Sequence, residues 1–96
     1  MTQNLKSTVE EAKRKIKETR ESLEDIARIG DQGSRVNKSE LLKSLSNQTF
    51  ANLKTIPGYL SRLSKSQEYK EAHEQLLNDF KGLVKDYSFL KIQYNL

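Results

Sequence analysis

The sequence predicts an all-α protein, an up-down-up antiparallel three-helix bundle with a kink or break in the second helix near Pro57. Apolar residues recur at steps of three and four through three long segments, which is the spacing of one helix face. No run alternates apolar and polar residues with period two for long, so no strand is expected. We therefore predict a single domain over residues 1–96, with helices at about 5–29, 38–64 and 67–94.

The first helix is predicted from a narrow apolar stripe on an otherwise charged segment. Ser7 and Glu10 have the spacing of a capping box, and Gly30 is a natural stop. Acid-before-base pairs four residues apart predict ion pairs along the exposed faces, at Glu10/Arg14, Glu11/Lys15 and Glu24/Arg28. The stripe itself comprises Leu5, Val9, Ala12, Ile16, Thr19, Leu23 and Ile26.

The second helix follows a glycine- and serine-containing linker, with Asn37 as its expected cap. Proline inside a helix removes one backbone hydrogen bond, and Gly58 beside it adds a propensity cost of about 1 kcal/mol. Because the apolar phase is roughly kept across Pro57, one bent helix is favoured over two separate helices. The stripe comprises Leu42, Leu45, Thr49, Leu53, Ile56, Leu60 and Leu63.

The third helix has the most regular repeat, and Ser66 is its expected cap. Leu77 and Val84 widen the stripe on one flank, which is typical of a helix packed against two neighbours. We therefore expect it to be the central core helix. Its stripe comprises Tyr69, His73, Leu76, Phe80, Leu83, Tyr87, Leu90 and Tyr94.

Composition excludes several classes of protein. The chain has no cysteine, so it forms no disulfide and has no thiolate metal site or thiol nucleophile, and no stretch is apolar enough to span a membrane. The net charge of +4 arises mainly from residues 30–66, which hold six basic and two acidic groups. These charges are too dispersed for the clustered face that nucleic acid requires, so nucleic acid is not expected as a partner.

No catalytic, metal-binding or cofactor-binding constellation is apparent. His73 has no carboxylate three or four residues away, so we interpret it as a partly buried structural residue. The acid pairs Glu10-Glu11 and Glu24-Asp25 lie on mixed-charge faces without an apolar pocket. Acidic residues flank the basic run 13–17, and the glycines of residues 30–34 follow a helix and lack the lysine of a phosphate loop. We expect no enzyme, no cofactor and no small-molecule substrate.

One feature does not fit a simple bundle. If the third helix continues to the end of the chain, Phe89, Ile92 and Leu96 lie about 180–240° around the helix from Leu83. This second apolar stripe is predicted to be exposed unless another segment covers it. Either the last residues fold back, or the stripe is a docking groove for an amphipathic partner helix, in which case these three residues bind the partner.

Three segments resemble the N-terminal three-helix regulatory domain, called Habc, of syntaxin-type SNARE proteins. They are the first helix from Thr8 to Ile29, ending Ile26-Ala27-Arg28-Ile29-Gly30, the opening of the second helix at residues 39–45, and residues 74–80 continuing to Tyr87 and Gln93. In the family's third helix a leucine, a phenylalanine, an aromatic residue and a glutamine follow in that order.

The resemblance implies a regulatory part of a longer protein that acts in vesicle transport and membrane fusion. It would bind its own SNARE helix, Sec/Munc-type proteins or tethering regulators, on the cytoplasmic side of an endosomal, vacuolar or Golgi membrane, with the membrane reached only through other parts of the protein. The alternative is a stand-alone small helical adaptor or immunity-type binding protein, and a basic nucleic-acid-binding domain ranks third.

Overall fold

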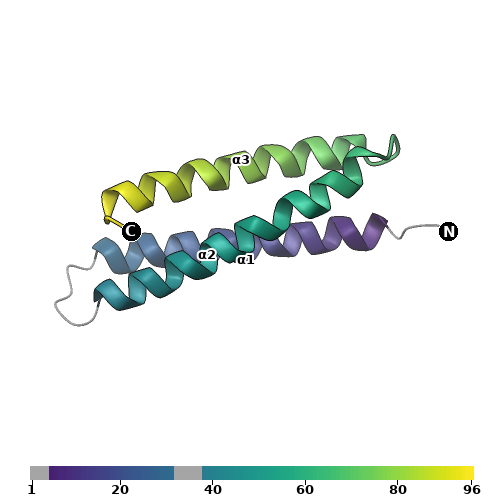
Figure 1. Ribbon diagram of the computed structural model, residues 1–96. Coiled ribbons are helices and arrows are strands. Elements are labelled where there is room, and N and C mark those ends of the chain that lie inside the picture. The colour runs from purple at the N-terminus through teal and green to yellow at the C-terminus, as the bar shows by residue number, and fades with distance from the viewer. Residues whose placement is uncertain (1–4, 32–37) are drawn as a thin grey trace.

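The three predicted helices are present in the computed structural model, which describes residues 5–31 and 38–96. They are α1 (Leu5–Asp31), α2 (Lys38–Ser64) and α3 (Lys70–Gln93), and no strand occurs in the described part of the chain. α2 runs antiparallel to both α1 and α3, so α1 and α3 are parallel (Figure 1). The predicted all-α, up-down-up three-helix bundle is confirmed.

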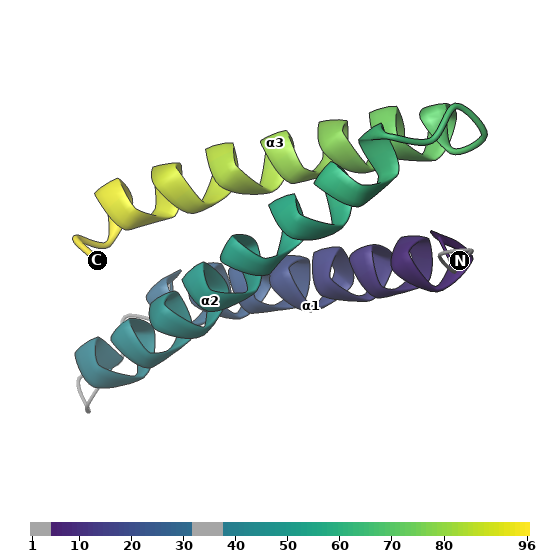
Figure 2. The ribbon, with the colours of Figure 1, turned by 45° about the vertical axis from the view of Figure 1, so that its right-hand side comes forward.

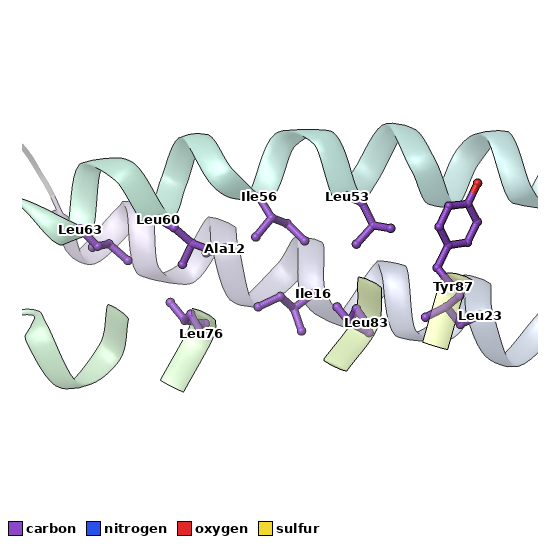
Figure 3. Close-up of a cluster of buried hydrophobic side chains, with 10 residues drawn as sticks. All are labelled: Ala12, Ile16, Leu23, Leu53, Ile56, Leu60, Leu63, Leu76, Leu83 and Tyr87. Carbon is purple, nitrogen blue, oxygen red and sulfur yellow. The ribbon is translucent and has the colours of Figure 1, made fainter. Parts of the chain in front are cut away.

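The core forms where the three apolar stripes meet along the bundle axis (Figure 3). Thr19 and Thr49 are fully buried on α1 and α2, and each hydroxyl donates a hydrogen bond of 2.7 Å to the carbonyl oxygen four residues earlier. These bonds satisfy hydroxyl groups that would otherwise be costly to bury. The buried apolar cluster comprises Ala12, Ile16, Leu23, Leu53, Ile56, Leu60, Leu63, Leu76, Leu83 and Tyr87.

α3 is not the central core helix that the sequence predicted. α1 and α2 share the most extensive interface, and α3 lies along this pair. Only three residues of α3 are buried, against eight of α1. The molecule measures 54 × 20 × 15 Å, and its radius of gyration is 15.5 Å, whereas about 12.5 Å is expected for a compact domain of this length. The long, thin form follows from the length of the helices, which have 24 to 27 residues, and Figure 2 shows α2 crossing from α1 at one end of the bundle toward α3 at the other.

α2 is one helix that includes Pro57, as the sequence favoured, so the alternative of a break into two separate helices does not occur. The ring of Pro57 is exposed, whereas Ile56 beside it is fully buried. The proline therefore lies on the solvent side, where its missing N–H costs one hydrogen bond without disturbing the core. The apolar stripe of α2 continues across residue 57, so the same helix face is buried before and after the proline.

The predicted helix ends are less accurate than the helices. α1 already includes Leu5, so Ser7 lies within the helix, and α1 continues through Gly30 to Asp31. α3 begins after Tyr69, which makes no side-chain capping bond, and Ser66 instead accepts the Tyr69 N–H with its backbone carbonyl at 3.3 Å. Ser66 is therefore part of a turn and does not cap α3. The predicted cap Asn37 lies outside the described residues.

The ion pairs of α1 use different partners from those predicted. Arg14 binds Glu11 at 2.7 Å and Glu18 at 3.4 Å, and its hydrogen bond lowers the pKa of Glu11. The other pairs are Lys15 with Glu18 at 3.6 Å and Arg28 with Asp25 at 3.1 Å. Three of the four pairs are three residues apart. All are on the surface, where screening by solvent keeps their contribution to stability small.

The C-terminus is tied to the end of α1. Asn95 has a φ of 57°, and the Leu96 N–H donates to the Lys91 carbonyl oxygen at 2.8 Å, which is the six-to-one bond of a Schellman motif. The Tyr94 hydroxyl donates to Asp31 Oδ1 at 2.5 Å. The ring of Tyr94 lies so close to buried Gly30 that a Cβ atom there would overlap it. Gly30 thus serves as a packing site for Tyr94 and not as the predicted helix stop.

Candidate functional site

α3 borders an open seam on each side, one with α2 and one with α1. The seam between α2 and α3 contains a groove of about 390 Å³ that is mainly apolar. Phe50 and Val84 keep 51% and 39% of their surface exposed in it, and Pro57 is also exposed. Its lining residues are Phe50, Leu53, Lys54, Pro57, Phe80, Val84, Tyr87, Ser88 and Lys91. We call this feature the α2/α3 groove.

Tyr87 fixes the aromatic part of the α2/α3 groove. Its buried hydroxyl donates to the Ser46 carbonyl oxygen at 3.1 Å and lies 2.9 Å from the Ser46 hydroxyl, which can donate to it in return. The Tyr87 ring stacks on Phe50, with ring centroids 6.5 Å apart and an angle of 24° between the rings. The two rings join α2 to α3 and hold the groove in one shape.

Two lysines form the charged part of the α2/α3 groove. Lys54 Nζ lies 5.3 Å from the centroid of Phe50, and Lys91 Nζ lies 5.3 Å from the centroid of Tyr87. These are cation–π distances. Neither lysine forms an ion pair within the described residues, and no acidic residue lines the groove. The groove therefore presents an apolar surface with positive charge on both helices.

The seam between α1 and α3 contains two depressions that share Arg20. The first, of about 310 Å³, is lined by Lys13, Ile16, Lys17, Arg20, Ala72, Gln75, Leu76 and Asp79. The second, of about 370 Å³, is lined by Arg20, Leu23, Glu24, Ala27, Leu83, Asp86, Phe89 and Leu90. Charge therefore changes along the seam, from mainly basic in the first depression to mainly acidic in the second.

The predicted partner-binding residues differ in their surroundings. Phe89 and Ile92 are 65% and 83% exposed, as predicted, and Phe89 lines the second α1/α3 depression. Leu96 is partly buried, because α3 ends at Gln93 and the turn at Asn95 changes the direction of the chain. A second apolar stripe that includes Leu96 requires a helix through residue 96, and α3 ends before it.

The α2/α3 groove was not predicted, although the sequence carries a signal for it. Phe50 lies outside the apolar stripe of α2, and Lys54 follows it by four residues. Tyr87 and Lys91 repeat this spacing on α3. An aromatic residue and a lysine at this spacing are neighbours on one helix face, so the repetition on two helices could have indicated a shared surface.

His73, and Glu24 of one acid pair, each line a surface depression. His73 is half-buried and lines a depression at the turn between α2 and α3, together with residues such as Lys70 and Glu74. Across residues 5–31 and 38–96, no three His, Asp or Glu side chains are grouped so that they could hold a metal ion. In the same ranges no helix has the length and apolar character to span a bilayer.

One tyrosine has a perturbed pKa. Tyr94 donates its phenolic hydrogen to the Asp31 carboxylate, and this hydrogen bond raises the pKa of Tyr94, with smaller contributions from desolvation and the negative charge of Asp31. The residue secures the chain end and lies apart from the grooves.

The candidate sites of the structure are surfaces for binding, namely the α2/α3 groove and the two α1/α3 depressions. No family model, curated protein or solved structure matches this chain.

Proposed function

We propose that this chain is a non-catalytic protein-interaction module that binds an amphipathic helix in the α2/α3 groove. The observation that carries the proposal is the pairing of exposed Phe50 and Val84 with two lysines and no carboxylate. Helix-in-groove recognition places an apolar helix face into such a surface. Because Lys54 and Lys91 lie on different helices, we expect acidic residues on both flanks of the partner's apolar stripe.

The aromatic stack supports this proposal because a preformed surface binds at a lower entropic cost. Tyr87 is held by two hydrogen-bond contacts with Ser46 and by Phe50. The lysines already lie over their rings, so an acidic partner meets charges that are in place. A bound helix would cover Phe50 and Val84, the groove's large apolar side chains that are most exposed in the free protein.

Two biological roles remain proposals within this function. The syntaxin resemblance implies a regulatory domain of a SNARE protein, with a SNARE helix, Sec/Munc-type proteins or tethering factors as partners, on the cytoplasmic side of an intracellular membrane. The second role is a small helical adaptor or immunity-type protein. The first predicts binding of a SNARE-motif helix in the groove, and the second predicts that this helix does not bind while other acidic amphipathic helices do.

The test is an NMR titration of the isotopically labelled full chain with synthetic helices. One peptide carries a leucine stripe flanked by glutamates, its control carries lysines in place of the glutamates, and a third is a SNARE-motif helix. The glutamate peptide should shift the amide signals of groove residues on α2 and α3. Absence of such shifts, or equal binding of the lysine control, would contradict the proposal.

A matched pair of variants locates the binding surface. Val84→Glu places a negative charge in the groove. It should lower the affinity for the glutamate peptide about tenfold or more, because the like charges repel. Leu41→Glu is the control, because Leu41 is 48% exposed on α2 and does not line the groove. It should leave the affinity within about twofold. Circular dichroism checks that both variants keep their helices, and equal weakening by both would count against the groove.

A further inference from the structure

The first α1/α3 depression brings three basic side chains together in the seam between α1 and α3, away from the α2/α3 groove. Lys13, Lys17 and Arg20 line it from α1, and all three are exposed. Their spacing of four and three residues places them in one row along a single helix face. Its volume of about 310 Å³ lies at the lower end of the range for small-molecule sites. We call this feature the basic cleft.

Six of the seven basic residues of α1 fall into two groups, and Lys6 belongs to neither. Arg14, Lys15 and Arg28, which do not line the cleft, all form ion pairs with acidic residues of the same helix. Lys13, Lys17 and Arg20 form none within the described residues. The row without ion pairs therefore lies where α1 borders the cleft, and its like charges, one helical turn apart, repel each other.

The surroundings of the row favour an anionic ligand. Ile16 and Leu76 are buried at the base of the cleft, and an apolar base strengthens charge interactions above it. Gln75 adds an amide group that can donate a hydrogen bond. Asp79 is the single acidic lining residue, so the cationic side chains exceed the carboxylates by two, three against one.

We propose that the basic cleft binds a compact ligand with several phosphate groups, such as an inositol polyphosphate. Lys13 and Arg20 are separated by about 10 Å along the helix axis, which suits more than one phosphate group. A long nucleic-acid backbone is disfavoured, because the next depression along the same seam contains Glu24 and Asp86. The ligand can be free in solution or the headgroup of a lipid, and the chemistry of recognition is the same.

The test is an NMR titration of the full chain with soluble inositol trisphosphate. We expect saturable shifts of amide signals in residues 13–20 and 72–79, with α2 unaffected. Flotation with phosphatidylcholine vesicles, with and without phosphatidylinositol bisphosphate, distinguishes the two sources. Binding to the phosphoinositide vesicles as well as to free inositol trisphosphate identifies a lipid headgroup. Binding to free inositol trisphosphate alone identifies a soluble ligand, and both outcomes support the cleft.

Two variants with equal charge separate the cleft from general electrostatic attraction. K13Q/K17Q/R20Q removes the basic row and should lower the affinity for inositol trisphosphate about tenfold or more. K43Q/K81Q/K85Q removes three exposed positive charges that do not line the cleft and should change the affinity by about twofold or less. The proposal is overturned if no saturable shift occurs, if the control loses as much affinity, or if duplex DNA or RNA binds the cleft and inositol trisphosphate does not.

This inference is independent of the proposed helix binding. The α2/α3 groove and the basic cleft share no lining residue. Val84→Glu should therefore leave binding of inositol trisphosphate unchanged, and K13Q/K17Q/R20Q should leave binding of the glutamate peptide unchanged. The two experiments therefore test the two proposals separately, and failure of one proposal does not contradict the other.

Discussion

Gly30 shows how a single residue in the last turn of a helix can depend on a distant part of the chain. Glycine within a helix usually costs about 0.5–1 kcal/mol relative to alanine. At Gly30 an added Cβ atom would overlap the ring of Tyr94, whereas at Gly82 it would meet nothing within 4 Å. The two glycines are therefore expected to respond differently to the same substitution.

We predict that Gly82→Ala raises the free energy of unfolding by about 0.5–1 kcal/mol, whereas Gly30→Ala gives no gain. At residue 30, the stability gained from the higher helix propensity of alanine is offset, because the Tyr94 ring must move and lose its hydrogen bond to Asp31. Urea unfolding measures both values. In a Tyr94→Ala background, Gly30→Ala should recover the gain seen at Gly82. An equal gain for the two single variants would show that Tyr94 does not pack on Gly30.

The bond between Tyr94 and Asp31 should also give the chain end a pH dependence. The folded-state pKa of Tyr94 is raised above its ordinary value of 10.0. The stabilisation is therefore present below about pH 10 and is lost as the pH rises through the raised pKa. We predict that Asp31→Ala lowers the pKa of Tyr94 toward its ordinary value, measured by the NMR shift of its ring carbons. Identical titrations in the two proteins would contradict the contact.

At the scale of elements, Pro57 is the main local conflict in α2. A proline has no N–H to donate to the carbonyl four residues earlier, and it is about 3 kcal/mol less favourable than alanine in a helix interior. Part of this cost is recovered because proline also restricts the unfolded chain. Since the ring is exposed and the helix is continuous, substitution removes the conflict without creating a cavity.

We predict that Pro57→Ala raises the free energy of unfolding by about 1–2 kcal/mol and slightly increases helicity. Urea unfolding followed by circular dichroism measures both. Gly58→Ala next to it is a suitable comparison, because no atom lies within 4 Å of the added Cβ, and it should gain about 0.5–1 kcal/mol. A loss of stability in Pro57→Ala would mean that the proline ring makes a contact that alanine cannot replace.

The elements themselves could be predicted from sequence because periodicity reports which helix face is apolar. The stripe from Leu42 to Leu63 correctly indicated one helix across Pro57. Periodicity does not report tertiary contacts, so it could not show that Tyr94 packs on Gly30 or that Ser66 serves a turn. Those details depend on how the helices meet, which local spacing leaves undetermined.

The candidate site could be predicted only in part, for the same reason. Exposure of Phe89 and Ile92 followed correctly from their positions around the helix. The α2/α3 groove depends on how far α3 lies from α2, and a strongly packed α3 would have buried Val84 and Phe50. The sequence shows apolar residues on a flank of α3, but it does not show how closely the neighbouring helix approaches them.

At the scale of the whole molecule, the uneven interfaces suggest uneven stability. α1 and α2 form the most extensive interface, and α3 has only three buried residues, Leu76, Leu83 and Tyr87. Elements with little buried apolar surface open at a lower free energy than the rest of a domain. Both proposed binding surfaces border α3. The least secured helix is thus the one that a ligand on either side would stabilise.

We predict that α3 opens as a unit at a free energy about 1–2 kcal/mol below that of the α1–α2 pair. Native-state hydrogen exchange by NMR, at increasing low concentrations of urea, measures the opening of each helix. A ligand that binds only when α3 is in place should raise the protection of α3 by an amount set by its concentration relative to its Kd. The matched control is a variant that no longer binds the ligand. It is Val84→Glu for the glutamate peptide and K13Q/K17Q/R20Q for inositol trisphosphate. Uniform protection across the three helices would contradict the prediction, because it would show that α3 and the α1–α2 pair unfold together despite their unequal packing.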